Sequence, residues 1–542
     1  MKLRIAVLTG IRAYPIVRMY SSKALETYGD KVSIEVIKLP IGVMGLATAS
    51  TLKHIIENIP EVKSLLKQFD VVLVSGRVEG DVGVLEDVIK RPVFKGSIDP
   101  SLLPETIGYL LEGGTLSKKG PAEEILLKNR LEQFKSSYRT VVSNIKPAFS
   151  IGPLKVPLRG PPVLLAAETP VTIPVSKVRE YSSWYEGQGA EIVIVGIPVE
   201  EDLDSSIKRV REAERGLNKA VLAVDSMKAK VIESGFEMGA ELALSLHPGN
   251  IEAFLPYRRE KAFVVIPTDP LAGDVYDAES GLPALKQTIA KAGSYGYEKL
   301  IADLILAPPC TGLLQSIESY LKFSSEVGSV PFMMGFANVT ELFDVDSIGV
   351  NAILSALAVE VGASLVLVSE ESWKARYSVV ETKISLMMAS VARQKGMPPV
   401  DLGIDMLVLK SKNPSRQSGV LLKAKERVEV NGESLKEELD RWGHVVIEVD
   451  HETGRIIACV FKAGAKTPER CYYGRSALNI LKRIISDNPE LSKQHAGYLG
   501  VELEKAEIAL ATGKQYTQDR PLEIGYSSKL ELVKEVLEGL QA

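Results

Sequence analysis

The middle of the chain repeats one short pattern, and this repeat restricts the fold more than any other feature. In each copy an apolar run ends in polar residues and a helical stretch follows. Runs that are apolar throughout indicate strands covered on both faces, as in parallel sheets. They lie at residues 162–167, 191–196, 220–224, 242–246, 262–266, 299–305, 330–335 and 364–368. Eight such units predict a (β/α)8 TIM barrel, typically about 250 residues, with a doubly wound open sheet as the alternative.

The flanking sequence predicts further domains on either side of the barrel. Residues 1–118 hold two strand-then-glycine segments, "RIAVLTG" and "DVVLVSGRVEGD", which indicate a Rossmann-like α/β domain. A charged amphipathic helix opens a helical linker over 119–160, and the barrel is expected at 161–397. The segments "DMLVLKS", "HVVIEVDHETGRIIACVFKAG" and "KLELVKEVLEGL" then predict an α+β domain over 398–542, with a hairpin turn at "DHETG".

Composition and charge exclude several classes of protein. The 542 residues are 45% hydrophobic and 25% charged, as is ordinary for soluble globular proteins. The net charge is −4 and no long basic run occurs, so we expect no nucleic acid partner. The start "MKLRIAVLTG" does not predict a signal peptide. Asn351 and Glu360 interrupt the most membrane-like stretch, 348–369, which we interpret as a buried helix followed by a buried strand, not as a membrane span.

Cysteine usage indicates the redox environment. The three cysteines, Cys310, Cys459 and Cys471, are too few for a disulfide scaffold, and none lies in a C-x-x-C pair. We therefore expect a reduced, cytoplasmic protein.

Polar residues gather at the expected carboxyl ends of the barrel strands, where such barrels carry their functional groups. The ends read Glu168-Thr169, Asp225-Ser226, Thr268-Asp269, Asp303, Asn338 with Thr340, and Ser369-Glu370-Glu371. Basic residues are almost absent before Lys374 and Arg376. Carboxylates in a pocket need donors, and a flat heterocycle with an amino group beside a ring N–H supplies two of them. The pattern therefore favours such a ligand.

Two other interpretations of these acids stay open. A divalent metal could satisfy several carboxylates, but His247 and Cys310 are the only histidine and cysteine in the barrel, and we expect no metal site. Each acid could instead cap the helix that follows its strand. For Asp225 this alternative has equal weight, because Asp and Ser are both good N-cap residues.

Two long motifs resemble a known family. The stretch "AVDSMKAKVIESGFEMGAELALSL" resembles the third strand and helix of the pterin-binding barrels, the dihydropteroate synthases and the methyltetrahydrofolate–corrinoid methyltransferases. The stretch 335–379 is more similar to a dihydropteroate synthase-related branch in organisms that make or use tetrahydromethanopterin. The N-terminal and C-terminal parts are similar to that branch as well. The resemblance implies that Asp225 and Asp303 bind the pterin.

The sequence also departs from dihydropteroate synthases, which hold a diphosphate leaving group. The Asn-rich motif of strand 1, the Lys of strand 7 and the Arg and His of strand 8 have no counterparts, and Leu244 replaces a pterin-binding Asn. Glu370 and Glu371 would repel a diphosphate. Asn338 instead resembles the Asn that methyltransferase barrels place near N5 of the pterin. The resemblance thus implies that the pterin half of the pocket is retained and the diphosphate half is not.

We interpret the chain as a pterin-binding protein of folate or tetrahydromethanopterin metabolism, similar to dihydropteroate synthase and with transferase activity. One alternative is methyl transfer from a methyl-tetrahydropterin to a corrinoid or another acceptor, and a second is a pterin carrier without catalysis. Magnesium is a candidate cofactor, and a corrinoid protein and a second copy of the chain are candidate partners. The candidate catalytic acids are Glu168 and Glu370, and the candidate ligand-binding residues are Asp225, Ser226, Asp303, Asn338, Asn250 and Lys374.

Two smaller features carry weaker predictions. The segment "GRVEGD" at 76–81 is rich in glycine but lacks the spacing of a nucleotide-binding loop, so it predicts no nucleotide site. The stretch "HAGYLGVELEKAEIAL" places His495, Glu502, Lys505 and Glu507 at helical spacings. We interpret it as a salt-bridged amphipathic helix, with a helix that closes the barrel mouth or binds a partner as the alternative.

Overall fold

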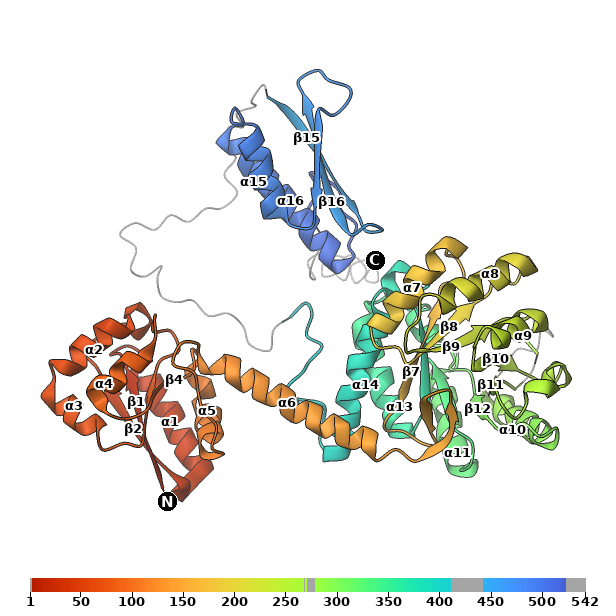
Figure 1. Ribbon diagram of the computed structural model, residues 1–542, viewed down its shortest axis with the longest axis horizontal. Helices are drawn as coiled ribbons and strands as arrows, with labels where there is room; N and C mark the ends of the chain where they lie inside the picture. Colours follow the sequence, from red (N-terminus) through yellow and green to blue (C-terminus); the bar gives the residue numbers. More distant parts are fainter. Residues whose placement is uncertain (1, 268, 271–277, 411–441, 523–542) are drawn as a thin grey trace, which may run out of the picture. The chain divides into compact units, whose positions relative to one another are not determined.

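The structure is a computed structural model that describes residues 2–267, 269–270, 278–410 and 442–522 (Figure 1). Two compact units make up the chain. The first consists of Met1–Phe343, Ile348–Ser369 and Ser378–Met406, and the second of Asp344–Ser347, Glu370–Tyr377 and Leu407–Ala542. We describe each unit by itself.

The N-terminal part is a doubly wound parallel sheet, as the sequence predicts. Its strands are β1 (Leu3–Thr9), β2 (Val32–Lys38), β3 (Val71–Val74) and β4 (Val93–Lys95), in the order β2-β1-β3-β4. One face packs on α1 (Tyr14–Tyr28) and α5 (Leu103–Leu111). The other packs on α2 (Ala49–Glu57), α3 (Pro60–Leu66) and α4 (Glu86–Ile89), so helices cover both faces (Figure 1).

A long helix and a short hairpin lead into the barrel. The helix α6 covers Ala122–Ser143, and the hairpin pairs β5 (Pro147–Ile151) with β6 (Leu154–Pro157). Ile151 and Val156 are at most 1% exposed and pack among the inward-facing side chains of the barrel strands. The hairpin therefore belongs to the core of the barrel.

The barrel itself is closed, and all eight predicted strands occur. They are β7 (Leu164–Thr169), β8 (Ile192–Gly196), β9 (Val221–Asp225), β10 (Leu242–Leu246), β11 (Ala262–Val265), β12 (Leu300–Asp303), β13 (Phe332–Gly335) and β14 (Leu365–Ser369). All neighbours are parallel, and β14 pairs with β7 to complete the ring. The alternative of an open sheet is wrong for these strands.

The strands bury side chains on both faces, which explains why they are apolar throughout. Ala166, Ile194 and Ala223 belong to the inner cluster, while their neighbours Leu165, Val195 and Val224 pack against the surrounding helices. Those helices are α7 (Val175–Gly187), α8 (Leu203–Glu214), α9 (Ala229–Glu237), α10 (Ala278–Ser294), α11 (Leu313–Glu326), α12 (Ala337–Thr340), α13 (Ser347–Val361) and α14 (Ser378–Lys395).

The segment after β10 differs from the predicted pattern of the barrel, whereas the stretch 348–369 agrees with it. After β10 the chain forms a 3-10 segment, Ile251–Tyr257, in place of a full helix; the segment is kinked at Phe254 and contains Pro256, which has no N–H for a continuous helix. The stretch 348–369 contains all of α13 except its first residue and the whole of β14, so it forms a helix and a strand, as predicted. Over the described residues, no helix is long and apolar enough to cross a membrane.

The C-terminal domain has the predicted antiparallel hairpin. The strands β15 (Gly443–Asp450), β16 (Arg455–Lys462) and β17 (Arg470–Gly474) form a sheet covered by α15 (Ala477–Asp487) and α16 (Lys493–Thr512). The turn "DHETG" joins β15 to β16, and Asp450 accepts the backbone N–H groups of Glu452 and Thr453. No strand forms over residues 405–410 of "DMLVLKS", whereas "KLELVKEVLEGL" lies outside the described residues.

The cysteines of this domain differ from the sequence expectation. Cys459 on β16 and Cys471 on β17 lie directly opposite each other, with Cα atoms 4.0 Å apart, and form a disulfide. The expectation of reduced cysteines is therefore wrong for this pair, because strand pairing, which the spacing of 12 residues does not reveal, brings them together. In α16, Lys505 pairs with Glu502, as expected for a salt-bridged helix.

Candidate functional site

Two aspartates close strands on different sides of the barrel mouth. Asp225 is the last residue of β9 and Asp303 is the last residue of β12, with two strands between them in the ring. Both are partly exposed to solvent but surrounded by protein atoms. The pKa of each is raised to about 6, mainly by burial, and the charge of Asp303 contributes to the rise for Asp225. The two carboxyls therefore interact electrostatically.

The hydrogen bonds of Asp303 leave one of its oxygens available. Its Oδ1 accepts from the backbone N–H of Ile305 at 2.9 Å and from the hydroxyl of Tyr320 at 3.1 Å. Both bonds lower the pKa of Asp303 against the effect of burial. Among the described residues no group donates to Oδ2. Tyr320 itself lies on α11 and is fully buried, so it fixes the orientation of the carboxylate.

Asp225 does not cap the helix that follows it. The N-cap residue of α9 is Lys228, which makes no side-chain cap, and the nearby backbone bond runs from Lys228 N to Ser226 Oγ at 3.1 Å. No side chain or backbone N–H in the described parts of the chain donates to the Asp225 carboxylate. The capping interpretation is therefore wrong, and Asp225 keeps its full capacity to accept hydrogen bonds. Ser226, 7% exposed, still has its hydroxyl proton to donate.

Asn250 and His247 form the loop after β10. The Asn250 amide is engaged at both ends, because Oδ1 accepts from His247 N at 2.8 Å and Nδ2 donates to Ser245 O at 3.1 Å. We therefore assign Asn250 to shaping the loop. His247 accepts the backbone N–H of Gly249 at Nδ1 and lies 3.9 Å from Asp269, and burial lowers its pKa. The neighbouring Thr268 lies outside the described residues.

Asn338 and Glu168 are the remaining predicted residues on the barrel strand ends. Asn338, on α12, donates from Nδ2 to Leu306 O at 3.0 Å, which brings it beside the loop after β12. Its Oδ1 receives no hydrogen bond from the described residues. Glu168 lies near the end of β7, where its carboxylate abuts Gly196 of β8, since a Cβ at that glycine would be 2.9 Å from Glu168 Oε1.

Glu370 and Lys374 belong to the second unit. Glu370 is 8% exposed. Lys374 Nζ lies 2.7 Å from the carboxylate of Asp344, so its charge is already paired. The guanidinium of Arg376 stacks on Trp373, with 4.3 Å from Cζ to the ring centre. Both cations predicted after strand 8 are thus engaged within their own unit.

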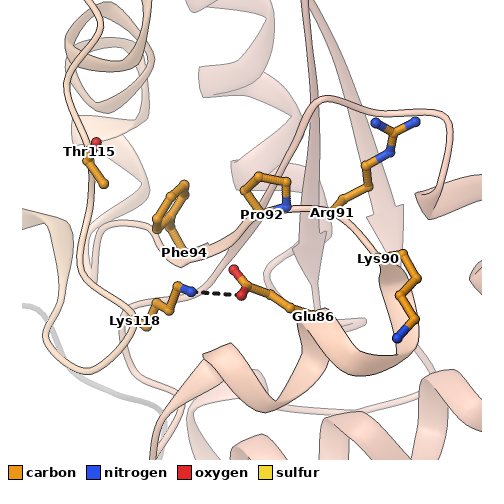
Figure 2. A pocket seen from close by; sticks show the side chains of 7 residues that line it. All are labelled: Glu86, Lys90, Arg91, Pro92, Phe94, Thr115 and Lys118. Atoms are coloured by element: carbon orange, nitrogen blue, oxygen red, sulfur yellow. Dashed lines mark hydrogen bonds and ion pairs between the residues drawn. The ribbon is translucent and has the colours of Figure 1, made fainter.

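A metal-binding cluster and a surface hollow are two further features that could hold a ligand. No group of three or more His, Cys, Asp or Glu in the described residues is arranged to hold a metal ion. A hollow of about 550 Å³ lies in the N-terminal domain at the start of β4 (Figure 2). There Glu86 accepts from Lys118 at 2.7 Å and from Val93 N at 3.0 Å, while Lys90 and Arg91 extend away from that pair.

Comparison with known proteins finds relatives over most of the chain. The uncharacterized protein MJ0107 of Methanocaldococcus jannaschii is 30% identical over 477 residues, which cover 84% of this chain and 88% of that protein. A Ycf91-like protein of Nostoc is 36% identical over 76 residues, covering 14% of this chain and 59% of that protein. A family model described as PterinBD-DUF4346 matches residues 439–519.

Solved structures are similar to part of the chain. Yersinia pestis dihydropteroate synthase with a pterine-sulfa conjugate is 18% identical, covers 45% of this chain and 99% of its own, and has a TM-score of 0.35. The Xanthomonas albilineans dihydropteroate synthase in complex with 7,8-dihydropteroate is 20% identical, with coverage of 44% and 94% and a TM-score of 0.34.

Proposed function

Because this chain belongs to the dihydropteroate synthase-related family, we propose that its barrel binds a pterin through Asp225 and Asp303. The observation that carries the proposal is the unused accepting capacity of these two carboxyls. Asp225 has no hydrogen-bond donor among the described residues, and Asp303 has one oxygen without a donor. Acceptors that protein atoms surround in this way gain hydrogen bonds when a ligand supplies the missing donors.

The chemistry of a pterin matches this arrangement. Its aminopyrimidinone ring presents an amino group beside a ring N–H, and these two donors fit one carboxylate. Hydrogen bonds to a charged partner contribute about 1.5–3 kcal/mol each. The raised pKa values near 6 mean that one carboxyl can keep its proton in mildly acidic solution and then donate to a ring acceptor. The pair can therefore hold a heterocycle with donors on one edge and acceptors on another.

The proposal also includes the type of reaction that the barrel catalyses on the pterin. We propose an enzyme of folate or tetrahydromethanopterin metabolism, of transferase type, in which the diphosphate-binding function of dihydropteroate synthase has been lost. Lys374, a cation that could have replaced the missing ones, is paired with Asp344. Magnesium would enter only with a phosphorylated substrate. Glu168 and Glu370 stay the candidate general acids or bases.

One observation favours methyl transfer as a second candidate. Asn338 holds its amide N–H on Leu306 O and leaves Oδ1 able to accept a hydrogen bond from a protonated ring nitrogen. Transfer of a methyl group from N5 of a tetrahydropterin to a corrinoid needs protonation or hydrogen bonding at N5, since a neutral amine leaves poorly. A carrier without catalysis would need Asp225 and Asp303 but not Asn338.

The test of pterin binding uses the full chain. We expect 7,8-dihydropterin to bind in calorimetry, and Asp225→Asn to weaken binding by tenfold or more, because the neutral amide loses the charge-assisted bonds. Glu241→Gln, an exchange of the same kind on the barrel at the start of β10, is the matched control and should bind like the wild type. Equal affinity for wild type and Asp225→Asn would refute the assignment. If Asp225→Asn weakens binding as expected, mass spectrometry of small molecules that co-purify with the protein would identify the pterin.

A further inference from the structure

The carboxyl edge of the N-terminal sheet is basic, in contrast to the acidic edge of the barrel. Each of its four parallel strands ends in a basic residue or is followed by one within three positions. Lys38 closes β2, Lys95 closes β4, and Arg12 and Arg77 follow β1 and β3. Because parallel strands bring their carboxyl ends to one edge, the topology places all four cations along the same side of the sheet.

The strand order gives this edge a special position. In the order β2-β1-β3-β4, the helix after β1 covers one face and the segment after β3 covers the other. The two connections diverge outside the carboxyl ends of β1 and β3, which is where open α/β sheets bind their ligands. The glycine-rich segment "GRVEGD" at 76–81 follows β3 at this point.

Arg77 reaches from the loop after β3 to the loop after β2. Its aliphatic stem packs on Gly45, since a Cβ at that glycine would lie 3.1 Å from Arg77 Cβ and 3.2 Å from its Cδ. Gly45 follows β2, so the side chain passes from the loop after β3 toward β2, across the end of β1. Arg12 lies on the loop after β1, and its backbone N–H donates to Gly42 O of the loop after β2 at 3.2 Å. Both guanidinium groups are exposed, and neither has a partner among the described residues.

Lys95 supplies a cation on a buried stem. It is 5% exposed, and in the described structure its ammonium makes no hydrogen bond or ion pair. The Nζ atom is not among the buried unpartnered atoms, so the methylenes are buried while the ammonium reaches solvent and can meet a ligand. Three acids of the segments around this edge, Asp81, Asp99 and Glu123, accept backbone N–H groups, and none of them forms an ion pair with Lys95.

We propose that this edge binds a phosphate-bearing small molecule, with Arg12, Arg77 and Lys95 supplying the charge. Arginine matches the planar, multidentate geometry of a phosphate, and lysine adds a point charge. The site is separate from the hollow of Figure 2, where the Lys118 charge is paired with Glu86. The proposal concerns the N-terminal domain and does not depend on pterin binding in the barrel.

Titration calorimetry of the full chain tests it, with inorganic pyrophosphate as the probe. We expect saturable binding that weakens at least tenfold in Arg77→Gln and in Lys95→Met, a change that keeps the volume of the buried side chain and removes its charge. Comparison of the affinities of ribose 5-phosphate and pyrophosphate shows whether the edge prefers a phosphate ester or free pyrophosphate. Citrate tests whether a polyanion without phosphate also binds. Binding of citrate as tight as that of both phosphates would overturn the assignment to phosphate.

Matched variants separate this site from others. Arg91→Gln removes the same charge from an exposed arginine just before β4, at the opposite edge of the sheet, and should bind pyrophosphate like the wild type. Asp225→Asn should also leave pyrophosphate binding unchanged. The pterin proposal and this proposal can therefore be refuted independently of each other. The absence of saturable binding, or an equal loss in Arg77→Gln and Arg91→Gln, would overturn the proposal. Circular dichroism checks that each variant is folded, and Arg77→Gln, at an exposed position, keeps the test valid if Lys95→Met does not fold.

Discussion

Tyr320 donates its hydroxyl to the same oxygen of Asp303 that accepts the backbone N–H of Ile305. Both donors therefore occupy Oδ1, and Oδ2 has no protein donor among the described residues. A carboxylate held on one oxygen has a fixed plane, and its second oxygen is positioned for a ligand. This relationship makes Tyr320 a positioning residue for the proposed site.

Replacing Tyr320 by phenylalanine should change the pH dependence of pterin binding. The hydroxyl lowers the pKa of Asp303 against the effect of burial, so its removal raises that pKa above about 6. Binding to the ionised carboxylate should weaken as pH falls, and the midpoint of that loss should move upward by roughly half to one pH unit. Calorimetry from pH 5 to 8 measures the shift.

The control for this variant is Tyr297→Phe. It also removes a buried hydroxyl, which donates to Ile251 O and does not touch Asp303. It should lower stability without moving the midpoint. If Tyr320→Phe only lowers stability, its hydroxyl is structural and does not tune Asp303.

Removing the Asp225 charge should stabilise the protein at neutral pH. Its pKa is raised to about 6 in the folded protein, against about 3.9 in an unfolded chain, so the folded state binds more protons between these values. Stability then falls as pH rises from about 4 to 6, and the loss is complete above 6. Asp225→Asn lacks this loss, and we expect a gain of about 1–3 kcal/mol at pH 7.5 that vanishes near pH 4. Thermal melting at both pH values measures it. A variant less stable than the wild type at pH 7.5 would show that the ionised Asp225 has a donor.

The protein should be a poor dihydropteroate synthase. The counterparts of the synthase cations are absent from the sequence, and Lys374 is paired with Asp344. Incubation with dihydropterin pyrophosphate, p-aminobenzoate and Mg²⁺ should yield little dihydropteroate above a reaction without protein. A robust yield that disappears in Lys374→Gln would contradict the prediction and would mean that this lysine leaves Asp344 to bind the diphosphate.

Asn338 separates methyl transfer from simple binding. If the barrel transfers a methyl group, Asn338→Ala should slow transfer from a methyl-tetrahydropterin by roughly 10²-fold or more, with a smaller effect on affinity. The visible spectrum of a corrinoid acceptor reports the reaction. If the wild type binds methyl-tetrahydropterin but never demethylates it with any corrinoid offered, the methyltransferase candidate is lost and a carrier becomes the better account.

Strand ends were predictable from the sequence, whereas the role of Asp225 as a site residue stays a prediction. Apolar runs that end in polar residues mark parallel strands and their carboxyl ends, and all eight strands occur. The hydrogen bonds of the site were not predictable, because they depend on loops. Asn250 turns back on its own loop, and Lys374 meets Asp344, 30 residues earlier. Tyr320 carried no sequence signal either, since only the packing of α11 brings its hydroxyl to Asp303.

The hairpin of β5 and β6 limits where the chain can be cut. Ile151 and Val156 seal the amino end of the barrel with apolar side chains, although they precede its first strand. A truncated protein that starts at residue 161 would leave Leu164, Ile192 and Val221 facing water at the barrel floor. Exposed apolar patches of this kind promote association. Such a fragment should therefore aggregate, whereas one that starts before Pro147 should stay monodisperse, so the smallest autonomous folding unit of the barrel includes a segment that its repeat pattern does not reveal.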